Sequence, residues 1–349
     1  MRAEDLLCPS PKGLYCPAGD FYVDPLRAVP RAVVTHGHSD HARAGHGAVL
    51  ATTETLDLMA LRLGPGFTGA RQPLAYGAAV EINGVRVSLH PAGHVLGSAQ
   101  VRLEKDGLVI VVSGDYKDAA DPTCVPFEPV RCHVFVTEAT FGLPVFRHPP
   151  AAGEVARLLA SAALFPERTH LVGAYSLGKA QRLMALIRQA GFTAPLHLHG
   201  ALAAVTDYYV SRGQDFGALE PVAAGAGRAG KAALAGAIVI APPMAMTDLW
   251  ARRFADPLTV FASGWMRVRA RARQRGVELP LVVSDHADWD GLCASVGATG
   301  CEELWVTHGA EDALVHWAHT RQLRARPLRL VGYGDEDGAS EPGLPGGAA

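Results

Sequence analysis

The residues of this sequence best suited to chemistry form a cluster of imidazole and carboxylate side chains near the N-terminus. Directly after the apolar run 32–34 come His36, His38, Asp40 and His41. Packing does not account for three imidazoles and a carboxylate within six residues, and a strand would distribute them over both of its faces. Zinc and neighbouring first-row ions prefer such ligands. The spacing predicts that the first two histidines grip one ion and that the Asp-His pair reaches a second.

Two ions need further ligands, and two later residues could supply them. His94 lies in a glycine-rich segment after an apolar run, where glycine lets the backbone turn. Asp115 directly follows the apolar run 108–113, and we expect this carboxylate to bridge both ions. His90 is nearby, but it continues its strand and is expected to be structural. Ions about 3.5–4 Å apart can activate water and stabilise a leaving oxygen, so the sequence predicts two-metal hydrolysis.

This series of motifs resembles the metallo-β-lactamase superfamily. An HxHxDH motif, a later single histidine in a glycine-rich turn and an aspartate at a strand end stand here in that superfamily's order. The segments around Glu138, His286 and His308 resemble motifs A, B and C of its nucleic-acid-processing β-CASP branch, and residues 173–181 resemble that branch's Ala-Leu-Gly-Arg/Lys-Ala-Gln helix start. Within the branch, residues 14–22 and 261–267 look most like bacterial ligase-associated DNA exonucleases.

The resemblance assigns a role to each matching residue. It implies one ion held by His36, His38 and His94, another held by Asp40, His41 and His308, and Asp115 between them. It also implies an acid–imidazole pair of Glu138 and His286 beside the metals, with His286 protonating the leaving oxygen. The catalytic set is therefore predicted to be Asp40, Glu138 and His286. The family has a further acid after its first strand, and Asp20 and Asp24 both qualify.

Candidate nucleic-acid contacts lie between motifs A and B. Lys179 at a helix start combines free N–H groups, the helix dipole and an ammonium, which suit a phosphate. Ser263 and Gly264 form a second candidate anion-binding turn. Further on, alternating arginines occupy positions Arg267, Arg269, Arg271, Arg273 and Arg275. In an extended chain these would line one face as a basic rail, whereas a helix would spread them around its cylinder. A solvated charged surface is the alternative.

The elements that must position these residues follow an α/β pattern. Short Val-, Ile- and Leu-rich runs alternate with helical stretches, which is typical of layered α/β structure. We expect strands at 32–35, 85–90, 108–113, 134–137, 171–174, 237–241, 258–262, 281–284 and 304–307, and helices at 153–163, 179–190, 201–212, 289–296 and 312–324. The resemblance implies an αββα sandwich from 1–145 and 280–333, a β-CASP-like α/β insert at 146–279, and a disordered tail at 334–349.

Composition narrows the class of protein. An apolar fraction of 49% and a charged fraction of 19% are ordinary for a soluble globular chain of 349 residues. The sequence contains neither a signal peptide nor an apolar run of membrane-spanning length, so we expect a cytoplasmic protein without membrane contact. Six sparse cysteines predict reduced thiols rather than a disulfide framework. A net charge of −2 argues against a general nucleic-acid coat but permits a local basic channel.

Together these features predict a nuclease that uses two divalent metal ions, zinc first and manganese as the alternative. The favoured activity is that of a DNA exonuclease in DNA repair, with DNA preferred over RNA as the partner. An RNA-processing endo- or exoribonuclease of the same fold is the rival. Hydrolysis of a small molecule would leave motifs A to C and the arginines unused. A DNA ligase or helicase partner is implied by the resemblance alone.

Overall fold

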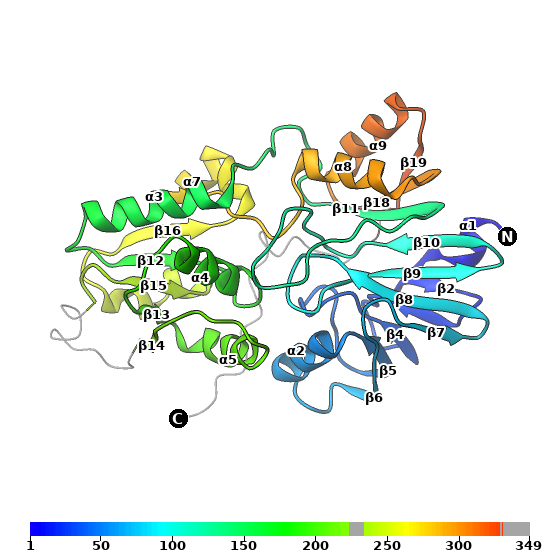
Figure 1. Cartoon of the computed structure of the whole chain (residues 1–349), viewed down its shortest axis with the longest axis horizontal. Coiled ribbons are helices and arrows are strands. Elements are labelled where there is room, and N and C mark those ends of the chain that lie inside the picture. The colour runs from blue at the N-terminus through cyan, green and yellow to red at the C-terminus, as the bar shows by residue number, and fades with distance from the viewer. Residues whose placement is uncertain (223–233, 329, 331–349) are drawn as a thin grey trace. The chain divides into compact units, whose positions relative to one another are not determined.

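The chain folds into two compact units in a computed structural model that describes residues 1–222, 234–328 and 330 (Figure 1). The first unit contains Met1–Arg147 and the described chain from His286 onward, and the second contains His148–Asp285. The sequence places the domain limits at 145/146 and 279/280, whereas the compact units divide at 147/148 and 285/286, and the domain assignment stays a prediction. The identity of the second unit as a β-CASP-like insert stays a prediction. The tail expected to be disordered from 334 lies outside the described residues.

The first sheet of unit 1 has six strands in sequential order. The first three pair antiparallel and the remaining neighbours pair parallel. The strands are β1 (Cys8–Ser10), β2 (Gly13–Cys16), β3 (Phe21–Val23), β4 (Arg31–Val33), β5 (His46–Ala51) and β6 (Thr68–Pro73).

The second sheet of unit 1 has seven strands in the order β19-β18-β11-β10-β9-β8-β7. Its β7–β10 half is an antiparallel meander, and its β10–β11–β18–β19 half is parallel. The strands are β7 (Ala79–Ile82), β8 (Val85–Pro91), β9 (Ala99–Lys105), β10 (Leu108–Val112), β11 (Val134–Ala139), β18 (Glu303–Gly309) and β19 (Arg324–Pro327).

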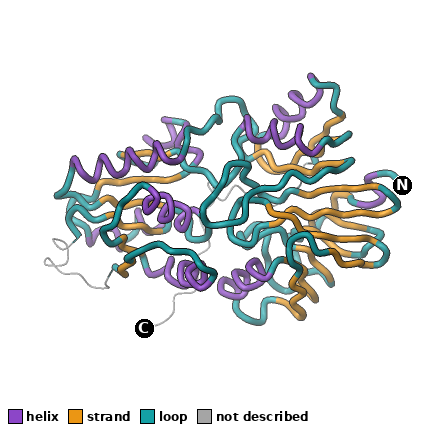
Figure 2. The backbone as a smooth tube through the Cα atoms, viewed as in Figure 1, coloured by secondary structure: helices purple, strands orange, loops and turns teal. Residues whose placement is uncertain are grey.

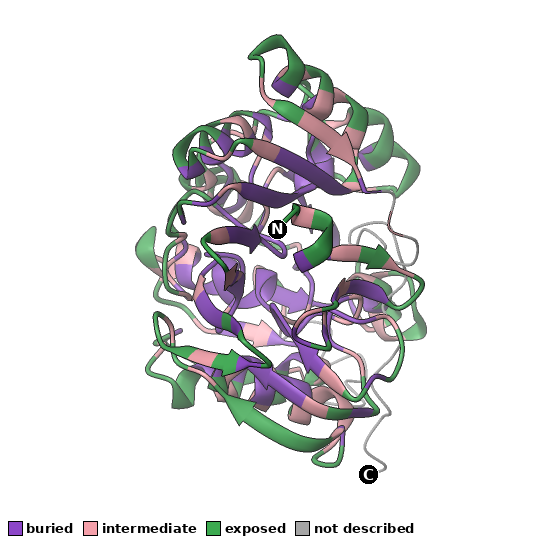
Figure 3. Ribbon diagram, turned by 90° about the vertical axis from the view of Figure 1, so that its right-hand side faces the viewer, coloured by how far each residue is buried: buried purple, intermediate pink, exposed green. Residues whose placement is uncertain are grey.

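Three apolar clusters among the described residues hold unit 1 together. The central cluster takes side chains from both sheets, for example Val33 of β4 and Val101 of β9, both fully buried. A second cluster covers the other face of the seven-stranded sheet with α8 (Trp289–Thr299) and α9 (Glu311–Thr320). A third covers the six-stranded sheet with α2 (Thr53–Leu63). Figure 3 shows buried residues along the central strands and exposed residues along the outer helices.

Unit 2 is built on a six-stranded parallel sheet in the order β14-β13-β15-β12-β16-β17. Strands and helices alternate along most of this part of the chain, and Figure 2 shows helices lying beside the strands. Every residue of β12 and β15 is buried, as expected when helices cover both faces of a parallel sheet. The strands are β12 (His170–Gly173), β13 (Leu196–Leu198), β14 (Leu219–Pro221), β15 (Ile238–Ala241), β16 (Leu258–Ala262) and β17 (Leu279–Leu281). The helices are α3 (Ala151–Leu164), α4 (Lys179–Gln189), α5 (Ala203–Ser211) and α7 (Arg269–Gln274).

Most expected elements are confirmed, and the mixed α/β class with several sheets is confirmed with them. Three expectations are wrong in detail. The helix expected at 312–324 ends at Thr320, and Arg324 already belongs to β19. The strand expected at 281–284 ends at Leu281. The alternating arginines are not extended, because residues 264–267 form a 3₁₀ turn and residues 269–274 form α7. No helix within the described residues combines the length and apolarity needed to cross a bilayer.

Candidate metal centre

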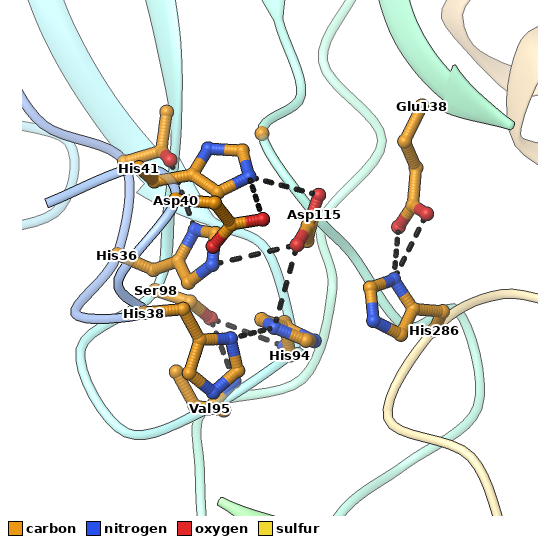
Figure 4. Close-up of polar contacts among 12 residues, drawn as sticks. His36, His38, Asp40, His41, His94, Val95, Ser98, Asp115, Glu138 and His286 are labelled. Carbon is orange, nitrogen blue, oxygen red and sulfur yellow. Dashed lines mark hydrogen bonds and ion pairs between the residues drawn. The ribbon is translucent and has the colours of Figure 1, made fainter. Parts of the chain in front are cut away.

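The first ligand loop, defined as residues 36–42, begins where β4 leaves the six-stranded sheet. Its turn is closed by the backbone N–H groups of His41 and Ala42, which both donate to the carbonyl of His38. Each of its three histidines is buried. Strand β4 thus delivers the whole HxHxDH motif to one point of unit 1, as the sequence predicts, and Figure 4 shows the side chains gathered there.

The second ligand loop, defined as residues 92–98, joins β8 to β9 and carries His94. Gly93 and Gly97 both have positive φ, so the loop turns where only glycine does so without strain. Inside the loop, the Ser98 hydroxyl accepts hydrogen bonds from the backbone N–H groups of His94 and Val95, at 3.1 and 3.2 Å. His94 Nε2 lies 3.0 Å from His38 Nδ1. The loop therefore directs His94 toward the first ligand loop.

Asp115 joins the two histidine groups. One carboxylate oxygen, Oδ2, lies 3.5 Å from His36 Nε2 and 3.8 Å from His94 Nε2. The other, Oδ1, lies 3.4 Å from His41 Nε2. Atoms that share a tetrahedral zinc ion with bonds of about 2.1 Å lie about 3.4 Å apart. Both oxygens of Asp115 therefore lie at about the distance from a histidine nitrogen that two ligands of one cation have.

Two buried ligand atoms give a physical reason for a bound cation. Among the described residues, no hydrogen bond reaches His36 Nε2 or Asp40 Oδ1, although both atoms are shielded from solvent. A buried polar atom without a partner costs roughly 1–3 kcal/mol, so a lone pair left in this state suits a metal. Three sets of possible ligand atoms lie within 4.8 Å of one another: His36, His38, His94 and Asp115; His36, Asp40 and His41; Asp115, Glu138 and His286.

Asp24 is the early acid that the sequence left undecided. Its Oδ2 lies 2.8 Å from His41 Nδ1, and it accepts hydrogen bonds from the backbone and hydroxyl of Thr35. Asp20 instead accepts a bond from the Tyr15 hydroxyl. Holding Nδ1 turns the other nitrogen of His41 toward Asp115, the usual function of a carboxylate behind a metal-bound histidine. Only the tertiary contact distinguishes the two acids.

The charges of the metal-free site are strongly coupled. Burial is the main reason why the pKa of His36 lies well below its usual range, and the neighbouring His41 lowers it further. Burial alone would also lower the pKa of His41, but the carboxylates of Asp115, Asp40 and Asp24 together raise it well above 6.5. The same contact with His41 holds the pKa of Asp115 well below its usual range despite burial. The metal-free cluster therefore already favours a positive charge where His41 and Asp115 meet.

Glu138 and His286 form the acid–imidazole pair that the resemblance implies. Glu138 stands on β11 and is fully buried. Its two oxygens lie 3.0 and 2.9 Å from His286 Nδ1, and Oε1 also accepts the backbone N–H of Tyr116 at 2.8 Å. The His286 ring lies 4.7 Å from the His94 ring, centroid to centroid. The carboxylate holds Nδ1, so Nε2 is the nitrogen that can exchange a proton beside the metal ligands.

His308 lies in β18, with its ring centroid 5.2 Å from that of His41. It has a positive φ of 57°, unusual for a residue other than glycine. Burial, followed by the charge on His41, lowers its pKa to about 3, so this imidazole is neutral and has the lone pair a metal requires. It is close to the second set of ligands, although none of the three sets above contains it.

The residues expected to bind nucleic acid belong to unit 2. Lys179 is 3% exposed, and its ammonium faces Asp285 Oδ2 at 3.7 Å and the Tyr175 ring at 4.9 Å. The buried Ser263 hydroxyl accepts the Trp265 N–H and so caps a 3₁₀ turn. These contacts give both side chains a structural role that the sequence did not reveal.

All five arginines between positions 267 and 275 are exposed. Arg271 stacks on Trp265 at 3.8 Å and Arg275 on Phe261 at 4.8 Å. The helical backbone of α7 spreads these side chains, so the single-face rail is wrong. Arg269 and Arg273, four residues apart, share one helical face.

Three known proteins illustrate what this chain is similar to. No protein-family model matches it. A protein named "Probable DNA ligase" from Opitutus terrae is 28% identical over 321 residues, covering 90% of this chain and 30% of that protein. Endoribonuclease ysh1 of Emericella nidulans is 33% identical over 135 residues, covering 37% and 14%. RNase aCSPSF2 of Saccharolobus solfataricus is 26% identical over 226 residues, covering 52% and 44%. The chain spans less than half the length of each relative.

A solved structure supports the fold alone. A crystal structure of a protein of unknown function from Enterococcus faecalis V583 superposes with a TM-score of 0.55 and 14% sequence identity. The superposition covers 85% of this chain and 78% of that one. The fold of this chain therefore has a counterpart in another protein.

Proposed function

Because this chain belongs to the β-CASP branch of the metallo-β-lactamase superfamily, we propose that it is a metal-dependent nuclease, and specifically a DNA exonuclease acting in DNA repair. The observation that carries this proposal is the Glu138–His286 pair beside Asp115. A thioester hydrolase needs no proton donor for its leaving group, because a thiolate departs unprotonated. A phosphodiester does, because its departing alkoxide is a strong base.

The cofactor we propose is a pair of divalent ions, zinc first and manganese as the alternative. His36, His38 and His94 would hold one ion, Asp40, His41 and His308 the other, and Asp115 both. Divalent cations supply a nucleophile near neutral pH by acidifying water, and they offset the charge that builds at phosphorus. The spacing of the Asp115 oxygens and the unbonded His36 Nε2 support this assignment.

The chain's own residues would manage the proton. His286 would donate from Nε2 to the leaving oxygen, while Glu138 fixes the ring through Nδ1 and stabilises its charged form. Asp24 would keep His41 in the tautomer that presents Nε2. Asp40 is proposed as both a ligand and a participant in catalysis, since its Oδ2 lies 3.7 Å from His41 Nε2.

RNA cleavage by the same chemistry is the second candidate. It is favoured by the names of two relatives, an endoribonuclease and an RNase. DNA is favoured by the relative named as a probable DNA ligase, because that match covers 90% of this chain. We extend the proposal to a DNA ligase or helicase as partner and to a cytoplasmic location. We also propose that the chain forms an αββα sandwich with an inserted domain. The three apolar clusters of unit 1 support this fold.

Contacts with the nucleic-acid backbone are proposed for Arg267, Arg269 and Arg271. These guanidinium groups are exposed, and arginine suits phosphate recognition because its planar fork matches phosphate oxygens. Lys179, Ser263 and Gly264 have less support as contacts, because all three are buried.

A cleavage assay tests the proposal. Purified protein, stripped with a chelator and reloaded with Zn²⁺ or Mn²⁺, is offered end-labelled single- and double-stranded DNA and RNA. We expect DNA to be degraded from an end. His38→Ala should abolish cleavage, and His90→Ala, which removes a histidine bonded to Ser88, should not. Cleavage of RNA alone would establish the rival activity, and hydrolysis of thioesters without any polynucleotide would overturn the nuclease assignment.

A further inference from the structure

Arg62 connects α2 to the first ligand loop. It stands in the last turn of the helix, where a positive charge complements the helix dipole. Its Nη2 donates to the carbonyl of Ala42 and lies 3.5 Å from the carbonyl of His38. These are the carbonyls at the end and in the middle of the turn that presents the HxHxDH side chains. One guanidinium group thus contacts the backbone of the turn that carries the proposed ligands His38, Asp40 and His41.

The opposite end of α2 contacts the second ligand loop. The carbonyl oxygen of Gly97 lies 2.7 Å from Thr52 Oγ1 and 3.0 Å from Thr55 Oγ1, so both hydroxyls are placed to donate to it. The approach is close enough to require glycine, since a Cβ on Gly97 would lie 2.5 Å from Glu54 Cβ and 2.8 Å from the backbone nitrogen of Thr55. The His94 loop therefore rests directly on the first turn of the helix.

The helix between these ends is docked through its apolar face. Its 11 residues span about 16 Å at 1.5 Å per residue. Leu56 and Met59 belong to the buried apolar cluster that also contains Val49 of β5 and Ala42 of the first ligand loop. A packed helix with polar contacts at both ends keeps its two contact points at a fixed distance, because its length cannot change without breaking its own hydrogen bonds.

We propose that α2 sets the separation of the two ligand loops, and that Arg62 and Thr55 are positioning residues for the metal centre. This inference rests on the metal site of the proposed function. Neither residue is a proposed metal ligand. Each would hold the backbone of a loop that carries proposed ligands, so that His38 and His94 approach one another before an ion binds.

The test measures metal binding rather than cleavage. Zn²⁺ affinity is obtained by competition with a chromophoric chelator, and the coordination geometry is followed in the visible spectrum of the Co²⁺-loaded protein. Arg62→Met is paired with Arg71→Met, because Arg71 makes the same kind of bond to the Pro65 carbonyl away from both loops. Thr55→Val is paired with Thr68→Val, whose hydroxyl donates to the His46 carbonyl.

We expect Arg62→Met and Thr55→Val each to weaken Zn²⁺ binding about 10–100-fold and to change the Co²⁺ spectrum, as loss of an outer partner of a ligand does. The two control variants should match the wild type. Arg62→Lys should keep part of the Zn²⁺ affinity, and it is the variant to measure if Arg62→Met does not fold. Wild-type affinity and spectrum in the test variants would overturn the inference. So would losses that merely parallel a lower melting temperature of the metal-free protein. A wild type that binds no metal would instead sink the metal centre itself.

Discussion

Replacing Glu138 by glutamine isolates the role of its charge. The side chain keeps its size and can still accept the backbone N–H of Tyr116 through its remaining oxygen. The new amide, however, would stand about where Oε2 now lies, 2.9 Å from His286 Nδ1. The remaining oxygen lies 3.0 Å from Nδ1 and can still accept its proton, but it no longer carries a negative charge. His286 therefore loses its charged partner while the metal ligands keep theirs.

The size of the effect follows from the bond removed. A hydrogen bond to a charged group contributes about 1.5–3 kcal/mol, and each 1.36 kcal/mol is a factor of ten in rate. We therefore expect kcat to fall about 10–150-fold with little change in KM or in bound metal. His286→Ala should cost more, about 10²–10⁴-fold, because it removes the proton donor itself. Glu303→Gln is the matched control, since Glu303 accepts a bond from the Trp305 indole outside the site.

A comparison of leaving groups makes the assay specific. The variants are measured on a labelled oligonucleotide and on a 4-nitrophenyl phosphodiester, whose nitrophenolate departs without a proton. If the Glu138–His286 pair protonates the leaving oxygen, Glu138→Gln should be impaired on the oligonucleotide and nearly normal on the nitrophenyl ester. Equal losses on both substrates, or wild-type cleavage of the oligonucleotide, would refute the reasoning.

Three further predictions concern other parts of the chain. Asp24→Asn should weaken Zn²⁺ binding about 10–100-fold in a chelator competition, whereas Asp20→Asn should not. Replacing Arg267, Arg269 and Arg271 by glutamine should reduce the slope of log affinity against log salt by up to about 3 on duplex DNA, and an unchanged slope in a binding titration would exclude them as phosphate contacts. Burial lowers the pKa of His170 from 6.5, so its neutral form is favoured in the fold and stability should fall as the pH drops below that value. Melting temperatures at about pH 7.5 and about pH 5.5 should therefore differ more for the wild type than for His170→Asn.

Much of the fold was accessible from local patterns. Parallel strands buried on both faces produce continuous apolar runs, so β12, β15 and β16 were predicted within a residue or so of their ends. Helix α2 was missed, although it lies between the first two ligand segments and contains a threonine cap at Thr52. For the arginines at 267–275, the local pattern indicated the wrong structure. Alternation suggested an extended chain, but stacking of Arg271 on Trp265 accompanies a helix.

The residue types of the metal centre were fixed by the sequence, because three histidines and an aspartate within six residues suit little besides a cation. Their partners were decided only by tertiary structure. Asp24 and Asp20 are equivalent acids in the sequence, yet only Asp24 reaches His41, 17 residues away. Glu138 and His286 are 148 residues apart and meet because β11 and the returning chain belong to the same unit. Local spacing identifies ligands, whereas the charges and hydrogen bonds that tune them depend on contacts that no local pattern contains.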